Sequence, residues 1–380
     1  MTRRGHGEGS IYQRNDGRWA AQIRLPGGAR RTYYAETRRD VQIKLANALR
    51  AQEQGLLSSK ATQTLSAYLQ EWLENFAKPS VRARTFASYE LNVRRARELI
   101  GWIRLNELTP AHIQGAYATL MKRGLAARTV WRMHMVLHRA LRQAVQAGIM
   151  LRNPVDGVSR PKARHYEVRT LSLEETRRLF EATKDHRLHA LWVVLATTGL
   201  RLGEALGLKW EDIDLKMGKL SVRRALQRET GVGFVLVEPK TARSRRTVYL
   251  APGTVDVLKE HRDRQAKERK VAENLWQEQF ELVFKTEVGK PMQDGQVSWR
   301  FHRALKQAGL PRIRIHDLRH TAATQLLERG VHPKVVQEML GHSTITLTLD
   351  TYSHVIPGLH AQAATEMQKL FERDDKENER

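Results

Sequence analysis

Apolar and polar side chains alternate over residues 10–36, which is the period of a β-strand. Turn-forming sequences at Asn15-Asp16-Gly17 and Pro26-Gly27-Gly28 divide this stretch and predict three short antiparallel strands. The period then becomes helical over residues 37–54. We therefore expect the chain to begin with a small sheet followed by one helix.

A longer helical pattern follows a predicted linker at residues 55–62. Its first helix has Thr64 as candidate N-cap and is expected to end at Lys78-Pro79. Three more helices are predicted at residues 84–100, from Thr109-Pro110 to the residue before Gly124, and at 127–147. Together these patterns predict a compact four-helix domain, with a second linker over residues 153–168.

The C-terminal half resumes the helical pattern with a capping box formed by Ser172 and Glu175. A mostly apolar helix is predicted at residues 187–198. Glycines then recur every fourth residue, at Gly199, Gly203 and Gly207, which favours close packing against a neighbouring segment. Arg201 would lie near the start of that segment, where free backbone amides attract an anion.

Residues 216–250 return to alternation, which predicts a small antiparallel sheet of about three strands at 220–227, 233–239 and 245–250. Helices are expected from Pro252 onward, up to a polar tail. The fold class is therefore mainly α with small antiparallel β elements (α+β). We expect three domains, at residues 1–58, 62–153 and 168–372, and a tail at 373–380.

The charge of the chain indicates a polyanionic partner. It carries 65 Lys and Arg against 41 Asp and Glu, a net charge of +24, and nucleic acid is the first interpretation. No apolar run approaches the roughly 20 residues that span a bilayer, and no signal peptide is evident. There are no cysteines. We expect a soluble, cytoplasmic protein that has no membrane partner.

Arginines in three places are candidates for contacts with DNA phosphates. A solvated basic surface would give the same pattern, and for the helix it is the more usual explanation. The candidates are Arg14, Arg18, Arg24, Arg30 and Arg31 in the N-terminal sheet, Arg128 and Arg132 on the helix at 127–147, and Arg243 and Arg245 in the turn after the strand at 233–239.

A further set of residues could act on a phosphodiester. Metal-free cleavage needs cations for the non-bridging oxygens, a nucleophile, and an acid for the leaving oxygen. His316 and Arg319 lie three apart, on one face of a predicted helix. His342 follows Gly341, the expected end of a helix that begins at Pro333, and Tyr352 lies ten residues later. Arg201 would supply a second guanidinium, which binds phosphate through two hydrogen bonds.

Each of these residues also has an ordinary structural explanation. A single His or Tyr is more often a packing or surface residue. Glu204 forms either a local ion pair with Arg201 or a brace for its guanidinium. The cations from Lys240 to Arg246 would also suit backbone phosphates. His316 and His320 have the spacing of a zinc-binding helix, but the sequence offers no obvious third ligand.

The combination resembles the motifs of a known family. TTGLRLGEALGL (197–208), PKTARSRRTVYL (239–250), HDLRHTAATQLLERG (316–330) and LGHSTITLTLDTYSHV (340–355) resemble the boxes of tyrosine site-specific recombinases, specifically phage and conjugative-transposon integrases, in their order and spacing. The stretch SIYQRNDGRWAAQIRLPGG resembles the arm-type DNA-binding domain of integrases. The central helical domain is similar in pattern only.

The resemblance implies a role for each catalytic position. Tyr352 would attack the scissile phosphate to form a 3′-phosphotyrosyl link, and Arg201, Arg319 and His342 would bind the non-bridging oxygens. Lys240 would be the general acid and His316 the base, with Glu204 behind Arg201. No metal, ATP or other cofactor is implied.

The resemblance also implies partners. These are double-stranded DNA with core-type and arm-type sites, a homotetramer whose segment 356–371 packs in trans, and, as possible accessory proteins, an excisionase and a host DNA-bending protein. The expected activity is integration of a mobile element such as a prophage, and its excision with accessory factors. The alternatives are a metal-dependent hydrolase and an inert DNA-binding accessory factor or repressor.

Overall fold

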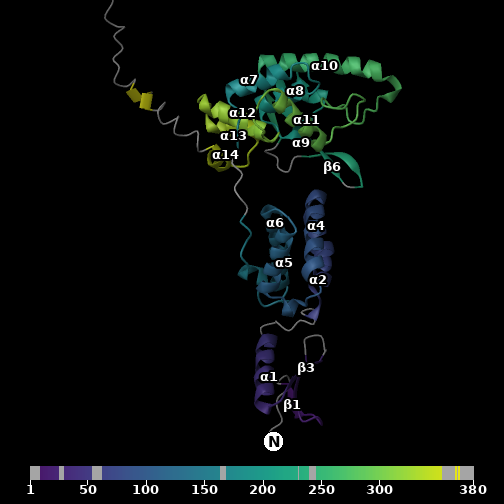
Figure 1. The fold of residues 1–380 in the computed structure, drawn as a ribbon, viewed down its shortest axis with the longest axis vertical. Helices are drawn as coiled ribbons and strands as arrows, with labels where there is room; N and C mark the ends of the chain where they lie inside the picture. Colours follow the sequence, from purple (N-terminus) through teal and green to yellow (C-terminus); the bar gives the residue numbers. More distant parts are fainter. Residues whose placement is uncertain are drawn as a thin grey trace, which may run out of the picture. The chain divides into compact units, whose positions relative to one another are not determined.

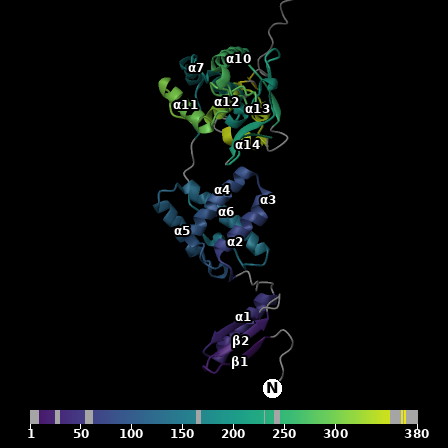
Figure 2. The ribbon, with the colours of Figure 1, turned by 90° about the vertical axis from the view of Figure 1, so that its right-hand side faces the viewer.

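The computed structural model describes residues 9–24, 30–53, 62–162, 168–229, 231–238, 245–352, 364–365 and 367–368. The chain divides into two compact units, Met1–His165 and Tyr166–Arg380. Both contain mostly helices and small antiparallel sheets, as the sequence predicts (Figures 1 and 2). The further division of the first unit into two domains remains a prediction.

The N-terminal sheet has the predicted form. Strands β1 (Ser10–Gln13), β2 (Trp19–Arg24) and β3 (Arg30–Ala35) are antiparallel, in the order β1-β2-β3. Helix α1 (Arg38–Glu53) packs on the sheet. A small apolar cluster lies between them, made of Ala21, Ile23, Val41, Leu45 and Ala48.

The rest of the first unit is a helical bundle around its own apolar cluster. Thr64 caps its first helix by accepting a hydrogen bond from the Ala67 amide. The described elements are α2 (Leu65–Trp72), a π-helical turn (Leu73–Ala77), α3 (Lys78–Ser80), α4 (Ala83–Ile100), a 3-10 turn (Leu105–Glu107), α5 (Pro110–Lys122), α6 (Ala127–Gln146) and a second 3-10 turn (Pro154–Gly157).

Two details of the bundle differ from the sequence expectation. The first helix does not end at Lys78-Pro79, because the π-turn intervenes and places Pro79 in the first turn of α3. A proline is tolerated there, since the N–H that it lacks would have no partner within the helix. Val155 and Val158 are buried in the bundle, so its core includes residues that the sequence assigned to the linker.

The second unit is organised around α8 (His189–Thr198), in which every residue except Thr197 is buried. A helix that is apolar on all sides belongs in a core. In Figure 1 the long helix α10 lies along one side of this unit, and α14 and β6 lie on the opposite side. The helices around α8 are α7 (Leu173–Ala182), α9 (Leu202–Leu206), α10 (Pro252–Ala272), α11 (Asp294–Gln307), α12 (Asp317–Glu328), α13 (Pro333–Leu340) and α14 (Ile345–Tyr352).

The prediction of one three-stranded sheet in this unit was wrong. Its strands form two sheets, β4-β5-β8 and the hairpin β6-β7. The predicted strand 220–227 is interrupted at Arg223-Arg224, because Arg224 Nη1 binds the buried Asp212 carboxylate at 2.6 Å. The strands are β4 (Ile213–Asp214), β5 (Lys219–Val222), β6 (Ala225–Glu229), β7 (Gly233–Val237) and β8 (Arg246–Tyr249).

The expectation of helices from Pro252 to the tail was also too simple. Residues 276–293 form no helix, and their backbone pairs through isolated β-bridges such as Lys285 with Pro291. Over the part of the chain that the structure covers, no helix has the length and apolar character needed to cross a membrane.

Candidate active site

The site is built at the C-terminal end of α8. Gly199 ends this helix in the left-handed conformation (φ 63°). A Cβ at this position would lie 2.5 Å from Leu340 Cδ2 of α13. Arg319, from the first turn of α12, donates from Nη1 to the Gly199 carbonyl at 2.8 Å. The C-terminal end of α8 therefore contacts the start of α12 and the end of α13 and fixes their positions.

Arg201 and Glu204 form a closed pair two residues further on. Glu204 Oε1 accepts from Arg201 Nη1 at 2.7 Å, and its Oε2 accepts from the Arg201 backbone amide at 3.0 Å. The Arg201 side chain is 41% exposed, whereas that of Glu204 is 7% exposed. Glu204 thus fixes the guanidinium from behind and occupies the amide that the sequence had left for an external anion. The glycine spacing has the expected effect, since Gly203 and Gly207 pack directly against the β6 backbone.

His316 and Arg319 lie at the start of α12. Arg319 is buried, and His316 is the residue before the helix and is partly exposed. Protein atoms around part of the His316 ring lower its pKa to about 4, and the neighbouring His320 and Arg319 act in the same direction. The rings of His316 and His320 pack edge to face, with their centroids 5.3 Å apart. His316 is therefore neutral at pH 7 and can accept a proton.

His342 faces inward, as its position after a helix-ending glycine predicts. Gly341 adopts the left-handed conformation (φ 68°) at the end of α13. The buried His342 places Nδ1 2.8 Å from Thr348 Oγ1 of α14. Burial, together with the nearby positive charges of Arg319 and Arg201, lowers the pKa of His342 to about 4.

Four predicted residues therefore converge from three segments of the second unit. Arg201 and Arg319 both act electrostatically on His316 and on His342, so the four side chains share one region. Two fixed positive charges beside two neutral imidazoles form a site that favours an anion. The described geometry suits a phosphate group.

The structure does not bring all the predicted residues together. Lys240 and Arg243 lie outside the described residues. Tyr352 is the last residue of α14, which packs on α13, and its side chain likewise lies outside the described part. Their places in the site remain predictions.

The predicted DNA-contacting arginines are mostly at the surface. Arg24, Arg30, Arg128 and Arg132 are exposed. Several are already engaged locally: Arg18 with Asp16 at 2.8 Å, Arg245 with Glu238 at 2.8 Å, Arg14 over the Tyr34 ring, Arg31 over the Tyr33 ring and Arg128 over the Trp131 ring. Exposure is compatible with phosphate contact and with a solvated surface, so these contacts also remain predictions.

Sequence reasoning missed Thr348 and the role of Arg246. Arg246 was noted only as one of a group of cations, yet its side chain is 6% exposed and donates to Glu204. Thr348 appeared only within the motif at residues 340–355. The alternation of β8 could have placed Arg246 on an inward face, but nothing in the sequence pairs Thr348 with His342.

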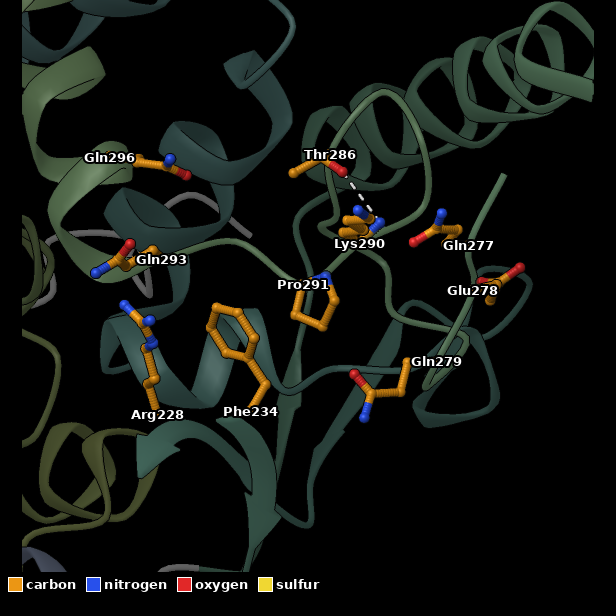
Figure 3. A pocket seen from close by; sticks show the side chains of 10 residues that line it. All are labelled: Arg228, Phe234, Gln277, Glu278, Gln279, Thr286, Lys290, Pro291, Gln293 and Gln296. Atoms are coloured by element: carbon orange, nitrogen blue, oxygen red, sulfur yellow. Dashed lines mark hydrogen bonds between the residues drawn. The ribbon is translucent and has the colours of Figure 1, made fainter. Parts of the chain in front are cut away.

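A separate hollow of about 610 Å³ lies beside the β6-β7 hairpin (Figure 3). Arg228 and Phe234 from the hairpin face Pro291 and Gln293 across it. None of the predicted catalytic residues lines it. Among the residues that the structure covers, no group of three or more His, Asp or Glu side chains could hold a metal ion, so the metal-hydrolase alternative gains no donor set there.

Comparison with known proteins gives the family. Residues 169–357 match the phage integrase family, and residues 64–121 match the phage integrase N-terminal SAM-like domain. A tyrosine recombinase XerC-like protein of Caldanaerobacter subterraneus subsp. tengcongensis is 33% identical over 361 residues, which are 90% of this chain and 92% of the relative. The chain belongs to the phage integrase family and is a tyrosine site-specific recombinase.

Solved structures share the fold. The Tn1549 transposon integrase bound to transposon right end DNA matches with a TM-score of 0.68 at 24% identity, over 82% of this chain and 100% of that one. A lambda integrase tetramer bound to a Holliday junction matches with a TM-score of 0.57 at 20% identity, over 92% and 96%.

Proposed function

We propose that this recombinase cleaves and rejoins DNA through a 3′-phosphotyrosyl intermediate on Tyr352, and so integrates a mobile element such as a prophage. With accessory factors it also excises the element. The observation that carries the proposal is the convergence of Arg201 and Arg319 on the neutral His342, ten residues before Tyr352. Arg201 and Arg319 are more than a hundred residues apart in the sequence.

The two arginines bind the non-bridging oxygens of the scissile phosphate. Arg201 is suited to this because Glu204 holds it from the inside while its outer side is open. In the transition state negative charge builds up on those oxygens, and guanidinium groups that are already fixed stabilise it without reorganising. When Nδ1 of His342 accepts a hydrogen bond from the Thr348 hydroxyl, the proton of the neutral ring lies on Nε2, which becomes a further donor to the phosphate.

Covalent transfer then proceeds in a balanced step. The Tyr352 phenol oxygen forms a bond to phosphorus, the bond from phosphorus to the 5′-oxygen breaks, and Lys240 protonates that oxygen. The phenol proton passes to His316, whose pKa rises when the negative phosphate is bound. Rejoining is the reverse step with a 5′-hydroxyl from another strand. It requires neither metal nor ATP, because the phosphotyrosyl bond retains the energy.

The proposed partners follow from charge and from the structural neighbours. A net charge of +24 suits double-stranded DNA. The Tn1549 integrase was solved on transposon DNA, and the lambda integrase as a tetramer on a Holliday junction. We assign to this chain core-type and arm-type DNA sites and a homotetramer in which residues 356–371 pack in trans. An excisionase and a host DNA-bending protein would set its direction.

A suicide substrate tests the proposal. A core-site duplex nicked next to the cleavage position loses a short 5′-hydroxyl fragment after attack, so the covalent protein–DNA adduct accumulates. We expect an adduct with the wild-type protein, also in the presence of a strong chelator, and none with Tyr352→Phe. DNA binding without an adduct would instead support the inert accessory factor or repressor. An adduct that persists in Tyr352→Phe would exclude Tyr352 as nucleophile.

A further inference from the structure

We propose that Arg246 is a positioning residue of the recombination site, which joins Glu204 behind Arg201 to the end of the helix that presents His342. The proposal rests on the function proposed above for Arg201 and His342. It assigns to Arg246 no contact with DNA.

The contacts of Arg246 link two separate segments. Arg246 is the first residue of β8, and its side chain is 6% exposed. Nη2 donates to Glu204 Oε2 at 2.9 Å, at the start of α9. Nε donates to the Met339 carbonyl at 2.6 Å, in the last turn of α13. One rigid guanidinium therefore sets the spacing between the Arg201–Glu204 pair and the turn that carries His342.

Gly341 leaves the space through which Arg246 reaches these partners. A Cβ on Gly341 would lie 3.1 Å from Arg246 Nη1 and 3.2 Å from its Cδ. These separations are shorter than an ordinary van der Waals contact, so a Cβ here would require the guanidinium to shift by a few tenths of an ångström. The residue before His342 is thus fitted to Arg246 as well as to the end of α13.

Charge gives Arg246 a second effect on the site. Glu204 is buried, and burial alone raises the pKa of its carboxyl, but Arg246 and then Arg201 bring that pKa below its usual value. The groups that face this carboxylate are Arg201 at the start of α9 and Arg246 from β8, and both arginines also act electrostatically on His342. Without Arg246, the carboxylate would take up a proton more readily and release Arg201, or draw the Arg201 guanidinium inward from the phosphate.

Exposure separates the roles of the two arginines. Arg201 is 41% exposed and can meet a phosphate, whereas Arg246 is 6% exposed and directs Nε and Nη2 to partners within the protein. Lysine cannot replace it fully, because a single ammonium on a flexible stem lacks the fixed fork that reaches both partners.

The test compares Arg246→Gln and Arg246→Lys with a matched control, Arg187→Gln. Arg187 is 15% exposed and makes two 2.7 Å hydrogen bonds with Glu268. It lies just before the N-terminus of α8, at the end of that helix opposite to the candidate site. Two quantities are measured for the full-length proteins. One is the affinity for an intact core-site duplex. The other is the single-turnover rate of adduct formation on the nicked substrate at saturating protein, from pH 5.5 to 8.5, per folded molecule.

We expect Arg246→Gln to lower the rate about 10- to 100-fold with unchanged affinity, and to lose rate more steeply than wild type as the pH falls. Arg246→Lys should recover part of the rate, and Arg187→Gln should lose thermal stability but keep the wild-type rate. An unchanged rate in Arg246→Gln, or a loss of affinity that accounts for the lower rate, would overturn the positioning role while the proposed function stands. A wild-type protein that forms no adduct would overturn the proposed function, and the positioning role with it.

Discussion

His342 shows how neighbouring side chains set the chemistry of a single residue. Its ring is buried and its pKa is lowered to about 4, so at pH 7 the ring is neutral, and the proposed function uses it as a hydrogen-bond donor and not as a cation. A neutral imidazole has one donor nitrogen, and the partner of the other nitrogen decides which one it is. Thr348 Oγ1 lies 2.8 Å from Nδ1, and the proposed function has this hydroxyl donate to Nδ1, which leaves the ring proton on Nε2.

Thr348 can be tested without a large change in volume. Thr348→Val removes the hydroxyl at nearly constant size, leaves Nδ1 of His342 without its partner, and no longer favours the proton on Nε2. We expect the rate of adduct formation to fall by about tenfold, with unchanged DNA affinity. Single-turnover assays would show this, and Thr348→Ser, which keeps the hydroxyl, should remain close to wild type. Equal rates in the Val and Ser variants would contradict the assignment.

Single residues were predictable where a motif carries them. His316 and Arg319 have helical spacing, and His342 follows a helix-ending glycine. The structure places all three with Arg201 in one region. Thr348 and Arg246 were not predictable in their roles, because each acts through a contact that only the folded chain creates. Arg246 and Glu204 are 42 residues apart, and no local pattern joins them.

The ends of three helices position the residues of the candidate site. The C-terminus of α8, the N-terminus of α12 and the C-terminus of α13 meet at Gly199, through the Arg319 side chain and Leu340. The left-handed backbone conformation of Gly199 is unfavourable for any residue that carries a Cβ. The close approach of Leu340 would add a steric clash. This junction should therefore be the most sensitive part of the site to substitution.

Two glycine substitutions separate these costs. Gly199→Ala adds a Cβ that would lie 2.5 Å from Leu340, whereas Gly231→Ala has the same kind of backbone (φ 80°) with no atom within 4 Å. We expect Gly231→Ala to lower the free energy of unfolding by about 1 kcal/mol and Gly199→Ala by about 3 kcal/mol or more. Urea unfolding of both variants would measure the difference. Similar losses in the two would mean that Leu340 moves away freely.

Helices and strands were predictable where local sequence signals determine them. The predictions failed where contacts between distant residues override those signals. The caps at Thr64 and Ser172 and the glycine end at Gly341 are as expected. The strand at 220–227 is split because Arg224 turns to Asp212, which the alternation of the strand cannot show. The π-turn before Pro79 likewise has no sequence signal of its own.

At the scale of the whole molecule, the sequence predicts more than the structure tests. The family, the mainly helical fold and the small sheets are confirmed. Separate apolar clusters in the N-terminal sheet and in the bundle are compatible with the predicted boundary at residues 58–62. The attachment-site sequences depend on which side chains meet which base edges and on DNA shape, and the hydrophobic pattern of the chain encodes neither.

The N-terminal sheet offers a prediction at this scale. Deleting residues 1–55 removes its whole apolar cluster and leaves that of the bundle intact. We expect the truncated protein to cleave core sites on short duplexes at the wild-type rate and to lose the bridging of core sites to distal arm sites. Gel-shift assays on long attachment-site DNA would detect the bridging. Integration by the truncated protein at the full-length level would refute the arm-binding role.

The central claim is tested most directly by locating the covalent bond. Digestion of the trapped adduct with trypsin should yield residues 335–369, in which Tyr352 is the single tyrosine. Mass spectrometry should find a nucleotide on Tyr352, joined through a 3′-phosphate, while the released strand carries a 5′-hydroxyl that a kinase can label without prior phosphatase. A nucleotide on another residue, a 5′-phosphate linkage, or a cleaved strand with no protein attached would contradict the account.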